Sequence, residues 1–193
     1  MKSWRKYLAD LQEIGDSINI QSNLNELRRC LVQTIRSQDG VIFTAGNGGS
    51  ASTAEHFSAD LSQMKKRVGV NSRSVCLTSN VALLSAISND LDFINAPEYI
   101  FSTLSNRNSL VVTFSASGNS ENIIRLHKTA SSVGISSFAF LGFDGGKMQA
   151  LQDINHVLFK TDTGLYGEVE NLHLAACHYL IDLLVDNFRD IEK

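Results

Sequence analysis

The stretch that decides the fold runs from residue 41 to residue 50, Val41-Ile42-Phe43-Thr44-Ala45-Gly46-Asn47-Gly48-Gly49-Ser50. An apolar run of the length of a buried strand stops there at glycines and a serine, and residues with helical spacing follow. A second stretch of the same build begins at residue 110, and its loop reads Ser115-Ala116-Ser117-Gly118-Asn119-Ser120. Each stretch predicts a strand, a phosphate-binding loop and a helix.

The two loops have the chemistry of a phosphate site. Glycine lets the backbone approach an oxyanion, the first N–H groups of a helix carry partial positive charge, and serine hydroxyls are neutral donors. An ordinary strand-to-helix turn is the commoner explanation for one such loop, but the repetition favours a ligand. Neither loop is a Walker A loop or a G-x-G-x-x-G dinucleotide loop. We therefore expect a sugar phosphate as ligand and no nucleotide cofactor.

Short apolar runs alternate with helical segments from residue 40 onward. The runs are 41–45, 74–78, 110–114, 137–141 and 156–160, and the helical segments are 51–66, 81–88, 121–133, 147–151 and 167–189. This alternation predicts an α/β fold with a five-stranded parallel sheet sandwiched by helices. Ligands of such sheets bind beyond the carboxyl ends of the strands, which is where both loops fall.

Residues 1–39 carry only helical spacing and predict an N-terminal helical arm. The sequence has no linker-like stretch, so we expect one domain over 1–193, divided into the arm and an α/β core at 40–193 with a long final helix. An arm of this kind must bury its apolar stripe, and a partner subunit is one place to do so. The arm therefore predicts a symmetric oligomer.

Composition excludes several classes of function. The net charge is −3 and no block of basic residues occurs, which argues against a nucleic-acid partner. No apolar run approaches the ~20 residues that span a bilayer, and the first residues lack the apolar core of a signal peptide. Cys30, Cys76 and Cys177 lack metal-type spacing, so we expect reduced thiols. The composition predicts a cytoplasmic protein that does not bind membranes.

Two helical segments carry titratable side chains that could do chemistry. His56 and Asp60 are four residues apart, so they share a helix face one turn inside the first loop, although a solvated surface pair has the same spacing. The final helix carries Glu170, His173 and His178 among apolar residues, where ionisable groups are costly unless paired or used. These three could line one pocket, whereas a core histidine with satisfied hydrogen bonds is the commoner outcome for each imidazole alone.

Taken in order, the motifs resemble those of the phosphoheptose isomerases of the sugar isomerase (SIS) superfamily. The motifs are Gly46-Asn47-Gly48-Gly49-Ser50, His56-Phe57-Ser58-Ala59-Asp60-Leu61, Asn89-Asp90, Ser115-x-Ser117-Gly118-Asn119-Ser120, Gly142-x-Asp144-Gly145-Gly146 and Glu170-x-x-His173-x-x-x-x-His178. The resemblance implies the SIS fold, which is flavodoxin-like, and a homotetramer with active sites at the subunit contacts.

The resemblance also implies a reaction, the conversion of sedoheptulose 7-phosphate to a D-glycero-D-manno-heptose 7-phosphate through an enediol. This step leads to the heptose of bacterial lipopolysaccharide or capsule. Carried over to this sequence, Asp60 is the base and His178 its acid partner. The positions matching substrate contacts are Asn47, Gly48, Gly49, Ser50, Asp90, Ser115, Ala116, Ser117, Ser120 and Glu170. Some members bind zinc, and the matching ligand positions are His56, Asp60, Glu170 and His178.

The sequence departs from the family pattern at four positions. Asp60 stands where the family has glutamate, Glu170 where it has glutamine, and Ala116 where it has threonine. Met64 stands at a position often held by arginine, for which Lys65 or Arg67 could substitute. The alternative function is therefore a non-catalytic SIS-domain phosphosugar-binding protein that engages a protein partner, of the replication-initiator-binding type. A decayed site would not be expected to keep acids at 60 and 170 together with His178, which favours the enzyme.

Overall fold

The computed structural model describes residues 2–189, and the predicted domain range extends past them to Met1 and to residues 190–193. Its sheet has five strands, all parallel, in the order β2-β1-β3-β4-β5. The strands are β1 (Ile42–Gly46), β2 (Ser74–Cys76), β3 (Leu110–Ser115), β4 (Ser137–Phe143) and β5 (Asn155–Lys160). The predicted parallel, flavodoxin-like sheet is confirmed.

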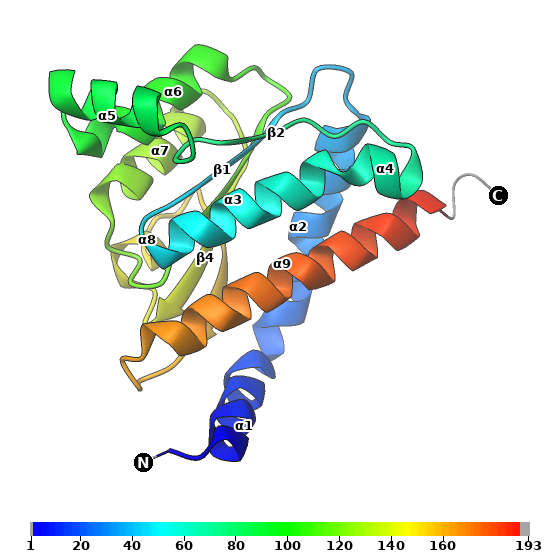
Figure 1. Ribbon diagram of the computed structural model, residues 1–193, viewed down its shortest axis with the longest axis vertical. Coiled ribbons are helices and arrows are strands. Elements are labelled where there is room, and N and C mark those ends of the chain that lie inside the picture. Colours follow the sequence, from blue (N-terminus) through cyan, green and yellow to red (C-terminus); the bar gives the residue numbers. More distant parts are fainter. Residues whose placement is uncertain (1, 190–193) are drawn as a thin grey trace.

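Helices cover both faces of the sheet (Figure 1). One face is covered by α2 (Ile18–Arg36), α3 (Gly49–Ser62) and α9 (Tyr166–Arg189). The other face is covered by α5 (Val81–Asp90), α6 (Ala96–Leu104) and α7 (Glu121–Ser132). The remaining elements are α1 (Trp4–Gly15), α4 (Met64–Val68), the 3-10 helix η1 (Phe93–Asn95) and α8 (Gly146–Gln149). Both α6 and η1 lie in a region to which the sequence analysis assigned no element, and the predicted helix at 51–66 is divided between α3 and α4.

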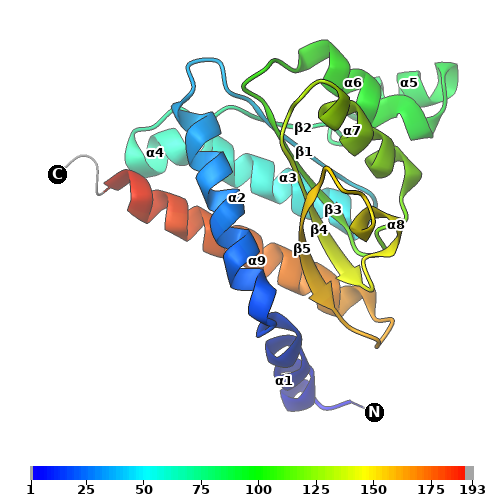
Figure 2. The same cartoon turned by 180° about the vertical axis from the view of Figure 1, so that it is seen from behind.

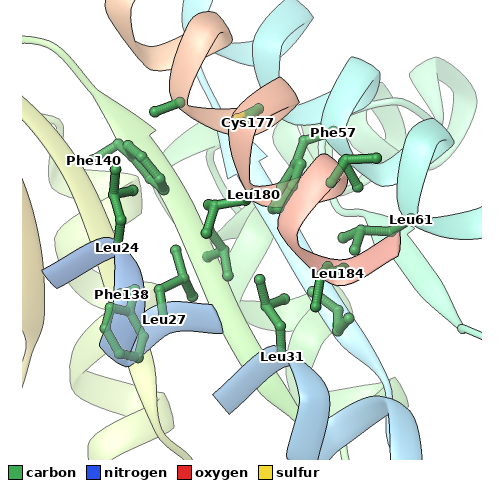
Figure 3. Packing of buried hydrophobic residues seen from close by; sticks show 14 of the residues in the cluster. Leu24, Leu27, Leu31, Phe57, Leu61, Phe138, Phe140, Cys177, Leu180 and Leu184 are labelled. Atoms are coloured by element: carbon green, nitrogen blue, oxygen red, sulfur yellow. The ribbon is translucent and has the colours of Figure 1, made fainter. Parts of the chain in front are cut away.

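The core on the α2, α3 and α9 face holds those helices in fixed positions. In Figure 3, leucines of α2 and α9 meet Phe57 and Leu61 of α3 over the rings of Phe138 and Phe140 on β4. The side chain between those rings, Ala139, belongs to the opposite core, because successive residues of a strand face opposite sides of the sheet. Each fully buried leucine or phenylalanine stabilises the fold by about 1.5–3 kcal/mol. The packing fixes α3 and α9 next to each other.

The predicted N-terminal arm consists of two helices with different environments. α2 lies across the sheet as part of the core (Figure 2). Its Leu27 and Leu31 are completely buried. α1 has no buried residue, and the side chains of Trp4 and Leu8 are exposed. α1 therefore leaves an apolar face that the described part of the chain, residues 2–189, does not cover. No helix within residues 2–189 has the length and apolar character needed to cross a membrane.

Candidate active site

The first loop connects β1 to α3 at the carboxyl edge of the sheet. A Cβ on Gly46 would lie 2.4 Å from the backbone oxygen of Ser50, so only glycine fits where the chain turns back over the helix. Gly48 has φ +55°, a conformation that side chains other than glycine rarely adopt. α3 begins at Gly49, and Ser50 is buried one residue further on. The loop therefore presents the unpaired N–H groups of a helix start, as the sequence predicts.

The second loop connects β3 to α7 and is braced by the segment that follows β4. Gly118 has φ +61°, and a Cβ there would lie 1.9 Å from the backbone oxygen of Gly145. The backbone N–H of Gly142 donates to Ala116, and that of Met148 donates to Gly118, both at 3.0 Å. A Cβ on Gly146 would lie 2.3 Å from the backbone oxygen of Ser117, so Gly118 and Gly146 let the two segments pack closely. The motif at 142–146 shapes the second loop rather than supplying a reactive side chain.

The two loops meet because β1 and β3 are neighbours in the sheet, with Gly46 paired to Phe114. The side-chain amides of Asn47 and Asn122 exchange two hydrogen bonds, each 2.9 Å long. Asn47, which matches a position beside the sugar, is thus held by a residue on α7 that sequence reasoning did not select. In the sequence, only the position of Asn122 just after the second loop could have indicated that it belongs to the site.

A cluster of three side chains lies between α3 and α9. His56 and Asp60 come from α3 and His178 from α9, and one ligand atom of each lies within 4.8 Å of the others. The Nε2 atoms of His56 and His178 are 3.0 Å apart, and His56 Nε2 is 3.4 Å from Asp60 Oδ2. The structure therefore brings the predicted base and the predicted acid to one place, from segments more than a hundred residues apart.

Asp60 is the buried member of this cluster. Its side chain is 12% exposed, whereas that of His56 is 49% exposed. Arg67 Nη2, from α4, donates a hydrogen bond to Asp60 Oδ1 over 2.6 Å. Burial raises the pKa of the neighbouring Cys177 thiol, and the negative charge of Asp60 raises it further. Asp60 thus lies among α3, α4 and α9, with Oδ2 directed to the imidazoles and Oδ1 to the guanidinium.

Glu170 lies apart from this cluster. Its two carboxylate oxygens are 2.5 Å from the place that a Cβ on Gly49 would take, at the start of α3. α3 and α9 run side by side in the same direction (Figure 1), so residue 170 faces residue 49 as residue 178 faces residue 56. Residues 170 and 178 are therefore about 12 Å apart along α9. The four predicted metal positions do not form one group within this chain.

Two other predicted positions, His173 and Asp90, differ in their surroundings. His173 is completely buried among the rings of Phe114, Phe140 and Phe159, where burial lowers its pKa to about 4. The suggestion that it lines a pocket with Glu170 is therefore wrong, because it packs in the core. Asp90 is exposed at the end of α5 and accepts a hydrogen bond from Asn89. Within residues 2–189 it has no hydrogen bond or ion pair with another predicted site residue.

Two of the three serines of the second loop, Ser115 and Ser120, contact each other. The hydroxyl of Ser115 donates to that of Ser120 over 3.4 Å, and Ser117 Oγ accepts a hydrogen bond from the backbone N–H of Asn119. Ser115 is buried, whereas Ser117 and Ser120 are partly exposed. Ala116 contributes its carbonyl oxygen to the contact with Gly142. The hydroxyls of Ser115 and Ser120 bond to each other only over this long distance, so a phosphate oxygen can take over their donor protons, and Ser117 keeps its own hydroxyl proton free to donate.

The donor set of the three-residue cluster suits a divalent metal. Two imidazole nitrogens and one carboxylate oxygen are a usual set of three protein ligands at catalytic zinc, which keeps a further position open. Two nitrogens bound to tetrahedral zinc are about 3.3 Å apart. The His56 and His178 nitrogens, at 3.0 Å, are already close to that spacing. The residues present therefore fit a zinc ion held by His56, Asp60 and His178.

Comparisons with known proteins agree with the fold and the motifs. The family model described as "SIS domain" matches residues 6–142. A phosphoheptose isomerase from Helicobacter hepaticus is 31% identical over 183 residues, which cover 93% of this chain and 89% of that one. A phosphoheptose isomerase from Helicobacter pylori is 29% identical over 185 residues, covering 95% and 94%. The solved phosphoheptose isomerase from Neisseria gonorrhoeae superposes with a TM-score of 0.81 at 26% identity, covering 93% and 92%. The chain belongs to the SIS-domain family, and within it to the phosphoheptose isomerases.

Proposed function

We propose that this protein is an aldose–ketose isomerase that interconverts sedoheptulose 7-phosphate and a D-glycero-D-manno-heptose 7-phosphate. The observation that carries the proposal is the meeting of Asp60 with His56 and His178 between α3 and α9. Such an isomerisation moves one proton between C1 and C2 through an enediol. It needs a carboxylate and an imidazole within reach of the same substrate.

Asp60 takes the proton in this proposal and His178 serves the substrate oxygen. Asp60 Oδ1 is occupied by Arg67, so Oδ2 is the atom that accepts the proton. His178 comes from the opposite helix and can protonate or deprotonate an oxygen on the far side of the substrate carbon. Both groups are held by helices packed on the core, and fixed geometry of this kind is what rapid proton transfer requires.

The phosphate of the substrate lies against the two loops in this proposal. Ser50, Ser115, Ser117 and Ser120 donate their hydroxyls, and the N–H groups at the start of α7 add partial positive charge. Glu170 of α9 lies beside the start of α3, and it is unsuited to bind the phosphate because both groups are anions. Its carboxylate instead accepts a hydrogen bond from a sugar hydroxyl, in company with Asn47.

Alternatively, His56, Asp60 and His178 are the side chains that would hold a zinc ion. When bound, the ion would polarise the substrate carbonyl and stabilise the negative charge of the enediolate. Glu170, as a fourth ligand, would have to come from another subunit, because it lies too far from the cluster along its own helix. Within residues 2–189, Asp90 is likewise exposed and has no hydrogen bond or ion pair with another predicted site residue, and the apolar face of α1 is uncovered. Both features suit a homotetramer with its sites at the subunit contacts. We further propose that the enzyme works in the cytoplasm, in heptose synthesis for surface polysaccharide.

A panel of seven-, six- and five-carbon ketose and aldose phosphates tests the proposal. We expect turnover to be fastest with the seven-carbon pair. His178→Ala should abolish it, whereas Asp186→Asn, an exposed carboxylate two turns further along α9, should leave it unchanged. Binding of the phosphates without turnover of any of them would instead favour the non-catalytic phosphosugar-binding protein.

A further inference from the structure

The short helix α4 places a cation against the acid of the site. α3 ends at Ser62, and the backbone N–H of Gln63 caps it by bonding to Ala59 and Asp60. α4 then begins at Met64 and is fixed to the core by the buried side chains of Met64 and Val68. This anchoring turns Arg67 back towards the last turn of α3. Its side chain is 36% exposed and reaches Asp60 over 2.6 Å.

We propose that Arg67 is a positioning residue that holds the Asp60 carboxylate with Oδ2 directed at His56 and His178. The proposal rests on the isomerase function proposed above. An aspartate side chain turns about two bonds, and a nearly buried carboxylate can be held in one orientation only if something binds one of its oxygens. Arg67 does so at Oδ1, and Oδ2 then lies 3.4 Å from His56 Nε2.

The charges around Asp60 also favour this role. A carboxylate that is 12% exposed has lost most of its water, and an ionic or hydrogen-bonding partner offsets the cost of that burial. Among residues 2–189, its ion pairs are those with Arg67 and His56, and α9 contributes the uncharged thiol of Cys177 beside it. Arg67 is therefore the one permanent positive charge that Asp60 contacts in this part of the chain.

Two other roles for Arg67 make different predictions. A substrate-binding arginine would raise KM when removed, because the ground state and the transition state would both lose a contact. An arginine that only ties α4 to α3 would lower stability without a specific effect on the chemical step. A positioning residue lowers kcat and leaves KM nearly unchanged, because the substrate still binds while the base is misdirected.

Steady-state kinetics of Arg67→Ala tests the role, with Lys66→Ala as the matched control on the exposed side of the same helix. We expect kcat to fall by about 10- to 100-fold in Arg67→Ala, with KM within about twofold of the parent. Arg67→Lys should recover part of the loss, since lysine keeps the charge but not the planar fork. Millimolar guanidinium should partly restore Arg67→Ala when sodium chloride at the same ionic strength does not. A raised KM with unchanged kcat, or an unaffected enzyme, overturns the proposal.

Unfolding by urea provides a readout that does not depend on turnover. If Asp60 and Arg67 hold each other, the midpoint shifts of Asp60→Asn and Arg67→Ala are smaller in combination than their sum. Shifts that simply add would show that the pair does not interact and would overturn the proposal. If the parent protein turned over no sugar phosphate, the proposed function and any catalytic role of Arg67 would fall together. A parent with normal turnover and an unaffected Arg67→Ala variant would remove the positioning role alone.

Discussion

His56 on α3 and His178 on α9 face each other with their Nε2 atoms 3.0 Å apart. The shared apolar core holds the two helices in place. This packing brings the two imidazoles together although they are far apart in the sequence. One ring must donate its N–H to the lone pair of the other, and Asp60 lies beside both. This arrangement suits either proton transfer or a metal ion.

Metal binding should depend on the histidine pair. We expect the purified protein to bind Co²⁺ or Zn²⁺ at about one ion per chain. His56→Ala should weaken binding by about 100-fold or more, because it removes one of three protein ligands. Calorimetric titration of metal-free protein, with elemental analysis of the product, measures this. His156→Ala on β5 is the matched control, and equal binding by His56→Ala and the parent would show that the ion, if any, lies elsewhere.

The effects of substitutions at Glu170 and Gly49 on the free energy of unfolding should depend strongly on each other. A methyl group at residue 49 would lie 2.5 Å from the Glu170 carboxylate, so Gly49→Ala must displace that side chain or shift α3 against α9. We expect Gly49→Ala to lower the free energy of unfolding by about 1–3 kcal/mol and to reduce turnover.

Two further variants test the cause of that loss. Glu170→Ala in the Gly49→Ala background should restore much of the stability, because it removes the clash. Gly48→Ala points into open space and should lose only about 1 kcal/mol through its positive φ. Purely additive losses in the double variant would contradict the contact.

His127 should make the protein less stable at acid pH. It is completely buried between Thr113 on β3 and Ser137 on β4, and burial lowers its pKa to about 3. The unfolded chain takes up a proton below about pH 6.5, whereas the folded protein does not until about pH 3, so stability present above pH 6.5 is lost as pH falls through this window.

Urea unfolding at pH 6.5 and pH 5 measures the effect. The loss from this residue alone is about 2 kcal/mol over that interval. Glutamine in His127→Gln cannot take up a proton and can still bridge the two hydroxyls. Between pH 6.5 and pH 5, the variant should therefore lose about 2 kcal/mol less stability than the parent protein. Parallel losses in the parent and the variant would mean that His127 is not held in its neutral form.

The assembly should depend on the exposed face of α1. Trp4 is 71% exposed and Leu8 is 46% exposed, which is unusual for large apolar side chains on one helix. If a second subunit covers them, Trp4→Asp should dissociate the oligomer without unfolding the chain. Light scattering coupled to gel filtration measures the mass, and circular dichroism checks folding. A parent protein that is monomeric at micromolar concentration would contradict the proposed tetramer.

Much of the fold was predictable because local patterns and packing agree. The strands before both loops are short apolar runs, the first closed by glycine and the second by serine, and each structural strand lies at the predicted place. The helix α6 was not predicted, although Pro97 in its first turn is a recognised start signal. The break between α3 and α4 has no glycine or proline to mark it, so the sequence left Lys65 and Arg67 as equal substitutes for the family's arginine, and only the structure places Arg67 beside Asp60.

The sequence predicted the angular positions of the site residues around their helices better than their positions along the helix axes and their burial. Helical spacing correctly places His56 and Asp60 on one face, because four residues make about one turn. The same arithmetic gives the angle between Glu170 and His178, but their axial separation of about 12 Å decides that they contact different parts of α3. His173 was open to both interpretations, because spacing does not reveal the phenylalanine rings that enclose it.

Exchange of substrate hydrogen with solvent tests the central claim most directly, because it follows the proton that Asp60 is proposed to carry. Sedoheptulose 7-phosphate is incubated with the protein in deuterium oxide, and deuterium at C1 or C2 is measured by NMR. We expect exchange with the parent protein and with Asp153→Asn, an exposed carboxylate on the opposite side of the sheet. Asp60→Asn should slow exchange by about 1,000-fold or more while still binding the sugar phosphate. Normal exchange by Asp60→Asn would contradict the account.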